Sequence, residues 1–370
     1  MAGIILQSPQ DVEDLTWGAA FYGIGGGGSP WAGMDALKAQ LERGGPINCI
    51  DPELFPDEAF VATHCFMGHD TPPTEEERKL MRDMGLDAPR CEDPLYEAMQ
   101  LLERITGKSF SGMVCAELGG GNTSGPLASA ARLGYTVFDG DYCGKAVPQM
   151  VQAGPVLNGF PHCPVASVDC WGNQAALLEA CNVGMNERIG KMLAVAAFGQ
   201  TAIAMFPLSG AEMKKIIIPG TISASHAVGK AIREAGERGA DPLRAIAETS
   251  GAELLFRGRL IHVDAKAVDG YYQGYRTIEG TGAFSGKMFK IWFKNENHMS
   301  WLDGEVRLTT PDLLCQVDAH TGIPVPNNNM ETGQEIAFFG LPAHERHTHA
   351  EGMSPQYYGF DVAYRPFKNR

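Results

Sequence analysis

Short, mostly apolar runs alternate with longer amphipathic segments along the first half of the chain. Residues 112–118 and 135–138 form two such runs, and their length and composition predict buried strands. Between them, residues 123–133 have the pattern of a helix, and the glycine at position 134 is typical of a helix C-terminus. A strand, a helix and a strand in this order make a βαβ unit, so we expect the two strands to be parallel neighbours.

The same alternation extends over residues 1–170. Ser8 before a proline, Thr74 before three glutamates and Asp93 before a proline are signals for helix N-termini. Residues 47–50 and 59–63 are predicted strands. These elements predict an α/β N-terminal domain with a mostly parallel sheet and flanking helices.

The pattern changes after residue 170. Residues 186–198 and 223–236 have helical periodicity, and residues 201–206 predict a strand. After residue 251 the strand-like runs are separated by turns rich in glycine, proline and asparagine. We therefore predict a second domain, residues 171–370, that is first helical and then a β-rich layer or barrel. Its strand-like runs cover residues 260–263, 287–293, 305–308, 313–317 and 335–339.

Polar and ionisable residues follow both strands of the βαβ unit. Glu117 and Asn122 come after the first strand, and Asp139, Asp141 and Cys143 come after the second. Ligands of open α/β sheets bind at the carboxyl ends of the strands, so we expect these side chains to face one crevice. Three neighbouring carboxylates would raise the pKa of at least one of them, which suits a proton donor. We also expect a helix to begin near Cys143, and a helix N-terminus would lower the pKa of the thiol.

Further candidates could bind a substrate. Lys145 and the main chain of the glycine-rich loop at 25–29 are candidates for holding an anionic group. His64 and His69 follow the predicted strand at 59–63, on the same edge of the sheet, where they either contact substrate or bind a divalent metal together with an aspartate. The polar run at 295–298 follows another strand and either bridges the domains or lines the cleft. The expected substrate-binding residues are Asn122, Lys145, Gly27, Ser29, His64, His69 and His226.

Each candidate also has a structural alternative. Asp139 and Asp141 could cap the next helix, and Cys143 could be a small core residue. His226 lies near a predicted helix start and is either a base or an ordinary residue of that region. The glycines at 25–28 could form only a tight turn.

Composition and charge narrow the classes of function. The chain has 370 residues and a formal net charge of −14, without a basic block, which argues against nucleic acid and anionic membranes as partners. No run approaches the ~18 apolar residues of a membrane span, and the first residues lack the basic region of a signal peptide. Its nine cysteines include no C-x-x-C pair, as expected for reduced thiols in the cytoplasm. We expect a cytoplasmic homo-oligomer that acts on a small molecule.

Seven motifs occur in a characteristic order: GGGGS at 25–29, ELGGGN at 117–122, DGDYCGKAVP at 139–148, GTIS at 220–223, NE at 295–296, PDL at 311–313 and TGIP at 321–324. Together they resemble the S-methyl thiohydantoin desulfurase family, formerly a domain of unknown function and often encoded beside hydantoinases. The resemblance spans nearly the whole chain. It departs from the commoner family pattern at positions 142–143, 145 and 149, and at the polar residues 64, 65 and 69. The departures mark either the desulfurase subgroup or a member with another substrate.

The resemblance implies hydrolysis at C2 of a thiohydantoin ring, with release of methanethiol or sulfide, in the breakdown of sulfur-bearing histidine derivatives. We hypothesise that Cys143 attacks C2, that Asp139, Asp141 and Glu117 act as acid and base, and that Asn122 hydrogen-bonds the ring. Full turnover by a Cys143→Ala protein would exclude the covalent route. No cofactor is expected, and a divalent metal is the open alternative. The competing functions are a metal-dependent cyclic amidohydrolase and a non-catalytic accessory subunit of a hydantoinase-type complex.

Overall fold

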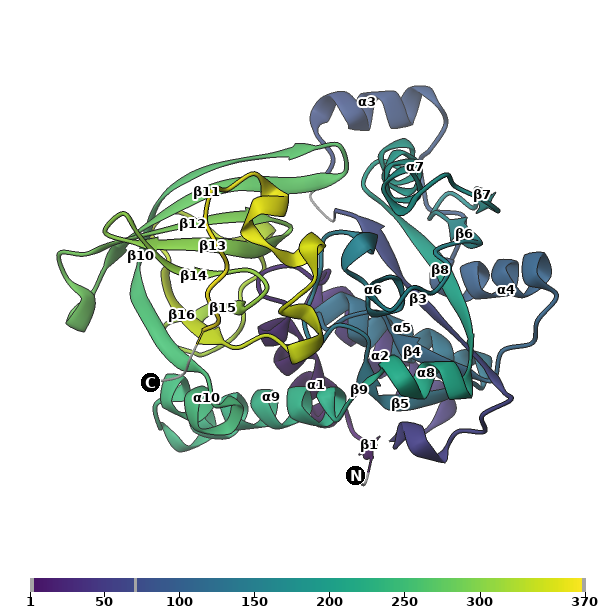
Figure 1. The fold of residues 1–370 in the computed structure, drawn as a ribbon, viewed down its shortest axis with the longest axis horizontal. Helices are drawn as coiled ribbons and strands as arrows, with labels where there is room; N and C mark the ends of the chain where they lie inside the picture. The colour runs from purple at the N-terminus through teal and green to yellow at the C-terminus, as the bar shows by residue number, and fades with distance from the viewer. Residues whose placement is uncertain (1–2, 70–71, 368–370) are drawn as a thin grey trace.

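The computed structural model describes residues 3–69 and 72–367 of the chain. A mixed sheet with helices on both faces lies beside an antiparallel sheet that curves into a half-barrel (Figure 1). The expected fold class, an α/β region followed by a helical and then β-rich region, is confirmed.

The first sheet has its parallel strands in the middle and antiparallel strands at both sides. Its order is β1-β2-β5-β4-β3-β8-β6-β7, and β9 pairs with β5. Parallel pairing joins β2, β5, β4 and β3, so the predicted βαβ unit is confirmed, with Met113 opposite Val137. The sheet takes strands from both sides of residue 170, and the domain boundary placed there stays a prediction. The bounds are β1 Ile4–Leu6, β2 Ile47–Ile50, β3 Phe60–Gly68, β4 Gly112–Cys115, β5 Thr136–Asp141, β6 Val165–Val168, β7 Gln174–Leu177, β8 Gln200–Ser209 and β9 Ile218–Pro219.

The helices begin at the expected capping signals. The Ser8 hydroxyl accepts a hydrogen bond from the Asp11 N–H (3.2 Å), and the Asp11 carboxylate accepts one from the Ser8 N–H (2.9 Å). Thr74 and Glu77 form the same reciprocal pair. The bounds are α1 Pro9–Tyr22, α2 Pro30–Gly44, α3 Glu75–Asp83, α4 Pro94–Thr106, α5 Gly120–Leu133, α6 Gly154–Leu157, α7 Val183–Ala196, α8 Gly210–Ile216, α9 Thr221–Arg238 and α10 Pro242–Ser250.

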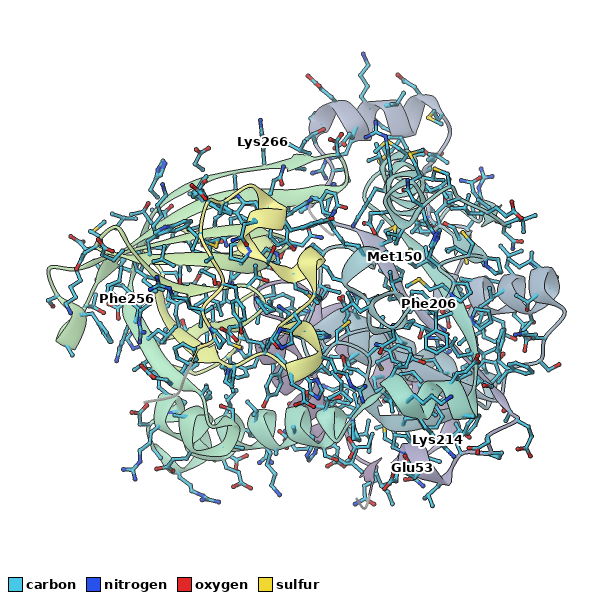
Figure 2. The ribbon with its side chains drawn as sticks, viewed as in Figure 1. Glu53, Met150, Phe206, Lys214, Phe256 and Lys266 are labelled. Carbon is cyan, nitrogen blue, oxygen red and sulfur yellow. The ribbon has the colours of Figure 1, made fainter. Side chains whose placement is uncertain are left out.

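Apolar side chains bury both faces of the first sheet. Helices α1, α2 and α5 cover one face, where Leu127 of α5 packs with Met113 of β4. Helices α7 and α8 cover the other face, where Met213 of α8 and Phe206 of β8 belong to one buried apolar cluster (Phe206 is labelled in Figure 2). Each of these fully buried side chains contributes about 1.5–3 kcal/mol to folding, so the middle strands are firmly held.

The second sheet encloses its own core and packs on helices α1, α9 and α10. Its order is β14-β13-β12-β11-β10-β16-β15, and Phe256, Phe289 and Phe338 fill its concave side. On its other side Phe339 meets Phe21 of α1, with ring centroids 5.9 Å apart, beside α9 and α10. The bounds are β10 Glu253–Val268, β11 Tyr271–Gly280, β12 Met288–Lys294, β13 Glu296–Leu302, β14 Glu305–Thr309, β15 Leu313–Asp318 and β16 Glu335–Leu341.

Short 3₁₀ turns near the C-terminus lie between the two sheets in Figure 1. The Gln152 amide donates hydrogen bonds to the Gly352 carbonyl (2.6 Å) and the Tyr358 hydroxyl (2.5 Å).

Within the described ranges, no helix has the length and apolar character needed to cross a membrane. The cytoplasmic location and the homo-oligomeric state stay predictions. The 3₁₀ turns are η1 Pro52–Leu54, η2 Met150–Gln152, η3 Gly282–Phe284, η4 Asn327–Asn329, η5 Glu345–His347, η6 Glu351–Met353 and η7 Pro355–Tyr358.

Candidate functional site

A cavity of about 120 Å³ lies where the two sheets meet. One wall comes from segments that follow β3, β4 and β5, at the carboxyl edge expected for ligand binding in an open α/β sheet. The opposite wall comes from the second sheet, and α7 contributes the side chains of Glu187 and Lys191. Four of the predicted site residues line this cavity: Glu117, Asn122, Gly27 and His69.

Glu117 is the carboxylate that the first sheet contributes. One of its oxygens accepts a hydrogen bond from the Asn122 amide and the other accepts one from the Val147 N–H, both at 2.7 Å. Asn122 in turn accepts a weak hydrogen bond from the Phe66 N–H (3.3 Å). Burial raises the pKa of Glu117 to about 7, against the opposing effect of these donors. The carboxyl group therefore exchanges a proton near neutral pH.

Glu296 is the carboxylate that the second sheet contributes. It opens β13 directly after Asn295, whose φ of +55° makes a sharp turn that asparagine tolerates better than most residues. Glu296 is 2% exposed, and its Oε2 atom has no hydrogen-bond partner among the residues described. Burial, reinforced by the charge of Glu117, raises its pKa well above the ordinary value. The charge of Glu117 thus favours the protonated form of Glu296.

The glycine loop at 25–28 separates and positions the two carboxylates. A Cβ at Gly26 would lie 1.9 Å from Glu296 Oε1, and a Cβ at Gly27 would lie 2.5 Å from the Gly119 Cα. Gly27 also has a φ of +77°, which side chains rarely adopt. Its carbonyl accepts hydrogen bonds from the N–H groups of Gly121 (3.0 Å) and Asn122 (2.9 Å), the first turn of α5. These amides are therefore satisfied by the loop.

A buried polar network anchors the second sheet to the glycine loop. The Asn327 N–H donates to the Gly25 carbonyl (2.7 Å), and the Asn327 amide donates to the Asn295 carbonyl (2.7 Å). The Arg276 guanidinium, 1% exposed, donates to both the side chain and the carbonyl of Asn327. Burial lowers the pKa of Arg276 to about 10, and the group stays charged at neutral pH. This network holds in place the turn at Asn295, which positions the Glu296 side chain.

Asp139 and Asp141 lie outside the cavity lining. Strand β5 pairs with β9 and continues to Asp141, so both aspartates belong to a paired strand and not to a loop beyond it. Asp139 accepts a hydrogen bond from the Ser223 N–H (2.8 Å) in the first turn of α9, which is not the next helix along the chain that the capping alternative named. Asp141 accepts hydrogen bonds from the N–H groups of Cys143 (2.8 Å) and Gly144 (2.7 Å), and burial raises its pKa to about 7. Both carboxyl groups bind main-chain N–H groups, and the Oδ1 atom of Asp141 has no hydrogen-bond partner among the residues described.

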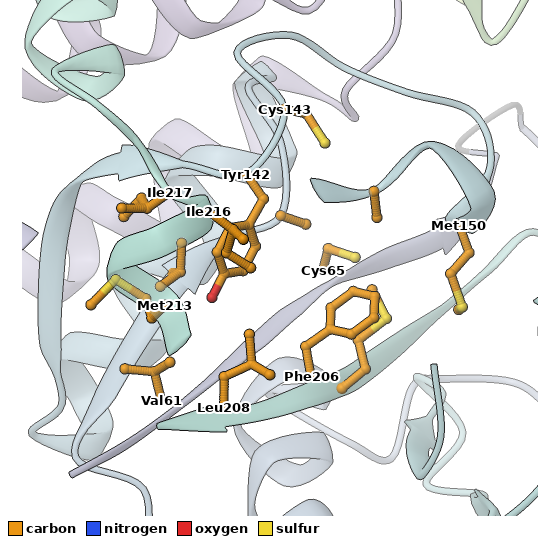
Figure 3. Close-up of a cluster of buried hydrophobic side chains, with 14 of the residues drawn as sticks. Val61, Cys65, Tyr142, Cys143, Met150, Phe206, Leu208, Met213, Ile216 and Ile217 are labelled. Carbon is orange, nitrogen blue, oxygen red and sulfur yellow. The ribbon is translucent and has the colours of Figure 1, made fainter. Parts of the chain in front are cut away.

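Cys143 also lies outside the cavity lining and is 1% exposed. Figure 3 shows it as a member of a cluster of buried apolar side chains that also includes Tyr142 and Met150. The expectation that a helix begins here is wrong, because the residues after Cys143 form an irregular loop. Burial raises the pKa of the thiol well above its ordinary value, and the charges of Asp141 and Glu117 add to the effect. The factors expected to activate this thiol are therefore missing, whereas Cys65 of β3 does line the cavity.

The other predicted residues outside the cavity lining have protein partners. The Lys145 ammonium donates to the Pro311 carbonyl (2.6 Å), and burial lowers its pKa to about 8. His64 lies 3.0 Å from the Pro126 carbonyl through Nε2, and burial lowers its pKa to about 4, which keeps the ring neutral. Ser29 caps α2, and His226 lies 3.4 Å from the Asp11 carboxylate. In the part of the chain that is described, no group of three or more His, Cys, Asp and Glu residues could hold a metal ion.

Sequence reasoning missed Glu187 and Lys191 and left the role of Glu296 open. Glu187 accepts hydrogen bonds from the Tyr271 hydroxyl (2.9 Å) and the Met150 N–H (2.7 Å). Lys191 lies one helical turn after Glu187, with its Nζ 3.7 Å from Glu187 Oε1. That i, i+4 spacing was the available signal, but it also describes ordinary surface pairs on exposed helices.

Comparisons with known proteins agree with this architecture. Two sequence models of one family match the chain: the S-Me-THD-like N-terminal domain over residues 10–179 and the S-Me-THD-like C-terminal domain over residues 181–367. A crystal structure of a protein from Chromobacterium violaceum has a similar fold, with a TM-score of 0.79, 19% sequence identity and coverage of 99% of this chain and 100% of that chain. At this identity the likeness concerns the fold alone. None of the curated proteins matches the chain.

Proposed function

Because this chain belongs to the S-Me-THD-like family, the family of S-methyl thiohydantoin desulfurase, we propose that it hydrolyses the C2–S bond of an S-methyl thiohydantoin. The products are a hydantoin and methanethiol. One observation carries the proposed chemistry: Glu117 and Glu296 bring two buried carboxyl groups with raised pKa values to one cavity from separate sheets. Family membership supports the substrate class, and the carboxyl pair supports acid–base hydrolysis.

Glu296 is the proposed acid. Its pKa is raised well above the ordinary value, which favours the protonated form, and its Oε2 atom lacks a protein partner in the described structure. C2 of the S-methylated ring is an isothiourea-type carbon, which becomes electrophilic when the neighbouring ring nitrogen is protonated. A proton from Glu296 to that nitrogen therefore prepares C2 for attack.

Glu117 is the proposed base. Its pKa of about 7 leaves a large ionised fraction at neutral pH, and hydrogen bonds from Asn122 and Val147 fix its orientation. The carboxylate removes a proton from water while the water oxygen bonds to C2. This step yields a tetrahedral carbon that carries both a hydroxyl group and the methylthio group.

Collapse of the tetrahedral carbon completes the reaction. The C2 hydroxyl returns a proton to Glu296 as the C2–S bond breaks, and its oxygen becomes the hydantoin carbonyl. The sulfur leaves with the electron pair of the C–S bond and takes the proton that Glu117 removed from water. Both carboxyl groups thereby regain their starting states, and the sum is substrate plus water giving hydantoin plus methanethiol.

This route uses direct attack by water. Cys143 has no part in it, since the thiol lies outside the cavity lining and its pKa is raised by burial. A covalent route would also need a thiolate, which a pKa well above neutrality disfavours. The proposed route therefore replaces the cysteine nucleophile with a carboxylate-activated water.

Thiol release tests the proposal. Chelator-treated protein is mixed with an S-methyl thiohydantoin in ¹⁸O-enriched water, and methanethiol and labelled hydantoin are quantified. We expect many turnovers, ¹⁸O in the C2 carbonyl and no enzyme adduct by intact-mass spectrometry. Ring opening in place of thiol release, or activity that depends on added metal, would replace the proposal by the cyclic amidohydrolase. A protein inert on its own that copurifies with a hydantoinase-type enzyme would support the accessory subunit.

A further inference from the structure

The Lys191 side chain brings a positive charge into the cavity without a hydrogen bond to hold it. Lys191 is 4% exposed and lines the cavity. Its ammonium lies 3.7 Å from Glu187 Oε1 and 4.3 Å from the centre of the Tyr271 ring. Neither contact is short enough or of the right kind to be a hydrogen bond, and the described residues offer Nζ no other acceptor. A buried ammonium in this state lacks hydrogen bonds for its N–H donors.

The neighbours of Lys191 hold its position without saturating its donors. Glu187 directs one oxygen to the Met150 N–H (2.7 Å) and the other to the Tyr271 hydroxyl (2.9 Å). The Tyr271 ring supports the ammonium from one face. Lys191 lines the cavity, where a ligand atom can accept hydrogen bonds from its ammonium group.

Lys191 is also the one lysine or arginine among the described residues that line the cavity. The carboxyl groups of Glu117 and Glu296 both feel its charge, which lowers their pKa values against the larger effect of burial. Cleavage of a carbon–sulfur bond moves an electron pair onto sulfur, and a site walled by protein solvates the new charge less well than bulk water does. A cation fixed in advance at the place where charge develops stabilises that step.

We propose that the Lys191 ammonium receives the sulfur of the leaving group as a thiolate while the C2–S bond breaks. This inference rests on the proposed hydrolysis of the C–S bond. The electron pair of that bond goes to sulfur, the thiolate is held by the N–H groups of Lys191, and the proton from Glu117 then releases it as a thiol. Lys191 keeps its charge throughout and acts by electrostatic stabilisation.

A series of leaving groups tests the role of Lys191. Lys191→Met keeps the aliphatic stem on Tyr271 and removes the charge, and Lys191→Arg keeps a charge. Lys294→Met is the matched control, because the Lys294 ammonium lies 4.0 Å from the centre of the same ring but outside the cavity lining. We expect Lys191→Met to lose about 100-fold in kcat/KM with the S-methyl substrate, in the range for removal of one electrostatic donor.

The pattern across substrates distinguishes this role from a structural one. With an S-(4-nitrophenyl) substrate, whose thiolate is stable without help, the loss of kcat/KM in Lys191→Met is expected to fall below about threefold. The rate of Lys191→Met therefore depends more steeply on the pKa of the leaving thiol than the rate of the wild type does. Lys191→Arg is expected to restore most of the S-methyl rate, and Lys294→Met is expected to follow the wild-type line. An equal loss for both substrates in a folded Lys191→Met protein would overturn the inference.

A binding measurement separates the inference from the proposed reaction. 4-Nitrothiophenolate, a coloured thiolate, is titrated into wild-type, Lys191→Met and Lys294→Met proteins. We expect the wild type and Lys294→Met to bind it, and Lys191→Met to bind it at least tenfold more weakly. Equal binding by all three proteins would overturn the thiolate site. A wild type that binds the thiolate through Lys191 but releases no thiol from any substrate would instead overturn the proposed hydrolysis and leave the anion site in place.

Discussion

Two regions of this protein contain the same kinds of side chain and use them differently. The β5 region at 139–145 holds two aspartates, a cysteine and a lysine, all buried. The cavity holds glutamates, a lysine and Cys65, also buried. In the β5 region, Asp139, Asp141 and Lys145 hydrogen-bond main-chain groups of the protein. In the cavity, Glu296 Oε2 is buried without a hydrogen-bond partner among the residues described, and the Lys191 ammonium is held only by an ion pair with Glu187 at 3.7 Å and by the Tyr271 ring.

The difference shows that burial and residue type do not by themselves identify a reactive group. A raised pKa occurs in both regions, for Asp141 in the first and Glu117 in the second, because desolvation acts wherever a carboxyl is buried. What separates the regions is where the unsatisfied oxygen lies: Asp141 Oδ1 also lacks a partner among the residues described, but Asp141 is outside the cavity lining, whereas Glu296 is part of it. A buried group whose bonds end on the main chain stabilises the fold, whereas a group left unsatisfied beside a cavity can bind a ligand.

The largest expected effect is the difference between substituting a carboxyl group in the cavity and substituting one in the β5 region. Glu117→Gln removes the proposed base, and we expect kcat/KM for thiol release to fall by about 10²–10⁴-fold, the usual contribution of a general base. Asp141→Asn is the matched control, since Asp141 has a similarly raised pKa but no place in the cavity lining. The control is expected to keep kcat within about threefold once its folding has been verified by circular dichroism. Comparable losses of kcat in both folded variants would contradict the proposed difference in role between Glu117 and Asp141.

Gly26→Ala tests whether the glycine loop positions Glu296. The added methyl would lie 1.9 Å from Glu296 Oε1, so the carboxyl must move, and we expect a loss of about 10–100-fold in kcat at little cost in folding. Gly236→Ala is the control, because a Cβ at Gly236 in α9 meets no atom within 4 Å. Steady-state kinetics with both variants decides the matter, and an active Gly26→Ala protein would contradict the positioning role.

The pH dependence of activity sharpens the comparison further. With a base of pKa about 7, kcat/KM for thiol release is expected to fall tenfold per pH unit below that value. Glu117→Gln is expected to abolish this limb of the profile, and Asp141→Asn to leave it unchanged. A wild-type profile that stays flat between pH 5 and about 7 would exclude Glu117 as the base.

The pH dependence of stability is expected to show both carboxyl groups. Their folded-state pKa values of about 7 lie above the ordinary values, 4.5 for Glu117 and 3.8 for Asp141, so the folded protein holds their protons more strongly. The contribution of these protons to the stability of the folded state is complete below the ordinary pKa values and is lost as the pH rises to about 7. Urea unfolding at several pH values should show that the free energy of unfolding declines less steeply with rising pH in Glu117→Gln or in Asp141→Asn than in the wild type.

Asp139→Ala should harm folding and spare catalysis. It removes the hydrogen bonds to Ser223 in the first turn of α9, and we expect the free energy of unfolding to fall by about 1–2 kcal/mol, as for other lost caps. Thermal unfolding measures this loss, and kcat measured well below the midpoint should match the wild type. A large drop in kcat without loss of stability would contradict this prediction and support a catalytic role for Asp139.

The two cysteines give the smallest expected effect. Cys143→Ala should keep full turnover, since the thiol lies outside the cavity lining, whereas iodoacetamide should reach Cys65 first and block the cavity. Burial raises the pKa of both thiols, so alkylation is slow, and Cys181, which is exposed, serves as the fast internal reference. Time-resolved peptide mass spectrometry would show whether inactivation follows Cys65, as expected, or Cys143.

Local sequence signals predicted the elements well because their causes are local. Capping residues, helix-ending glycines and apolar runs act on their own neighbours, so the βαβ unit and most of the helices were foreseen. The same reasoning placed Glu117 and Asn122 at the carboxyl edge of the sheet, where they lie. It misplaced Asp139 and Asp141, because pairing with β9, about 78 residues later, prolongs β5 through both of them.

The amino-acid sequence by itself determined the α/β architecture, the family and one carboxylate of the cavity. The tertiary structure alone decided that Glu117 meets Glu296, that Lys191 faces both, and that Cys143 does not join them. The reason is physical. Proximity across two sheets and exclusion of water set the pKa values and leave donors unsatisfied, and both depend on segments that lie far apart in the chain.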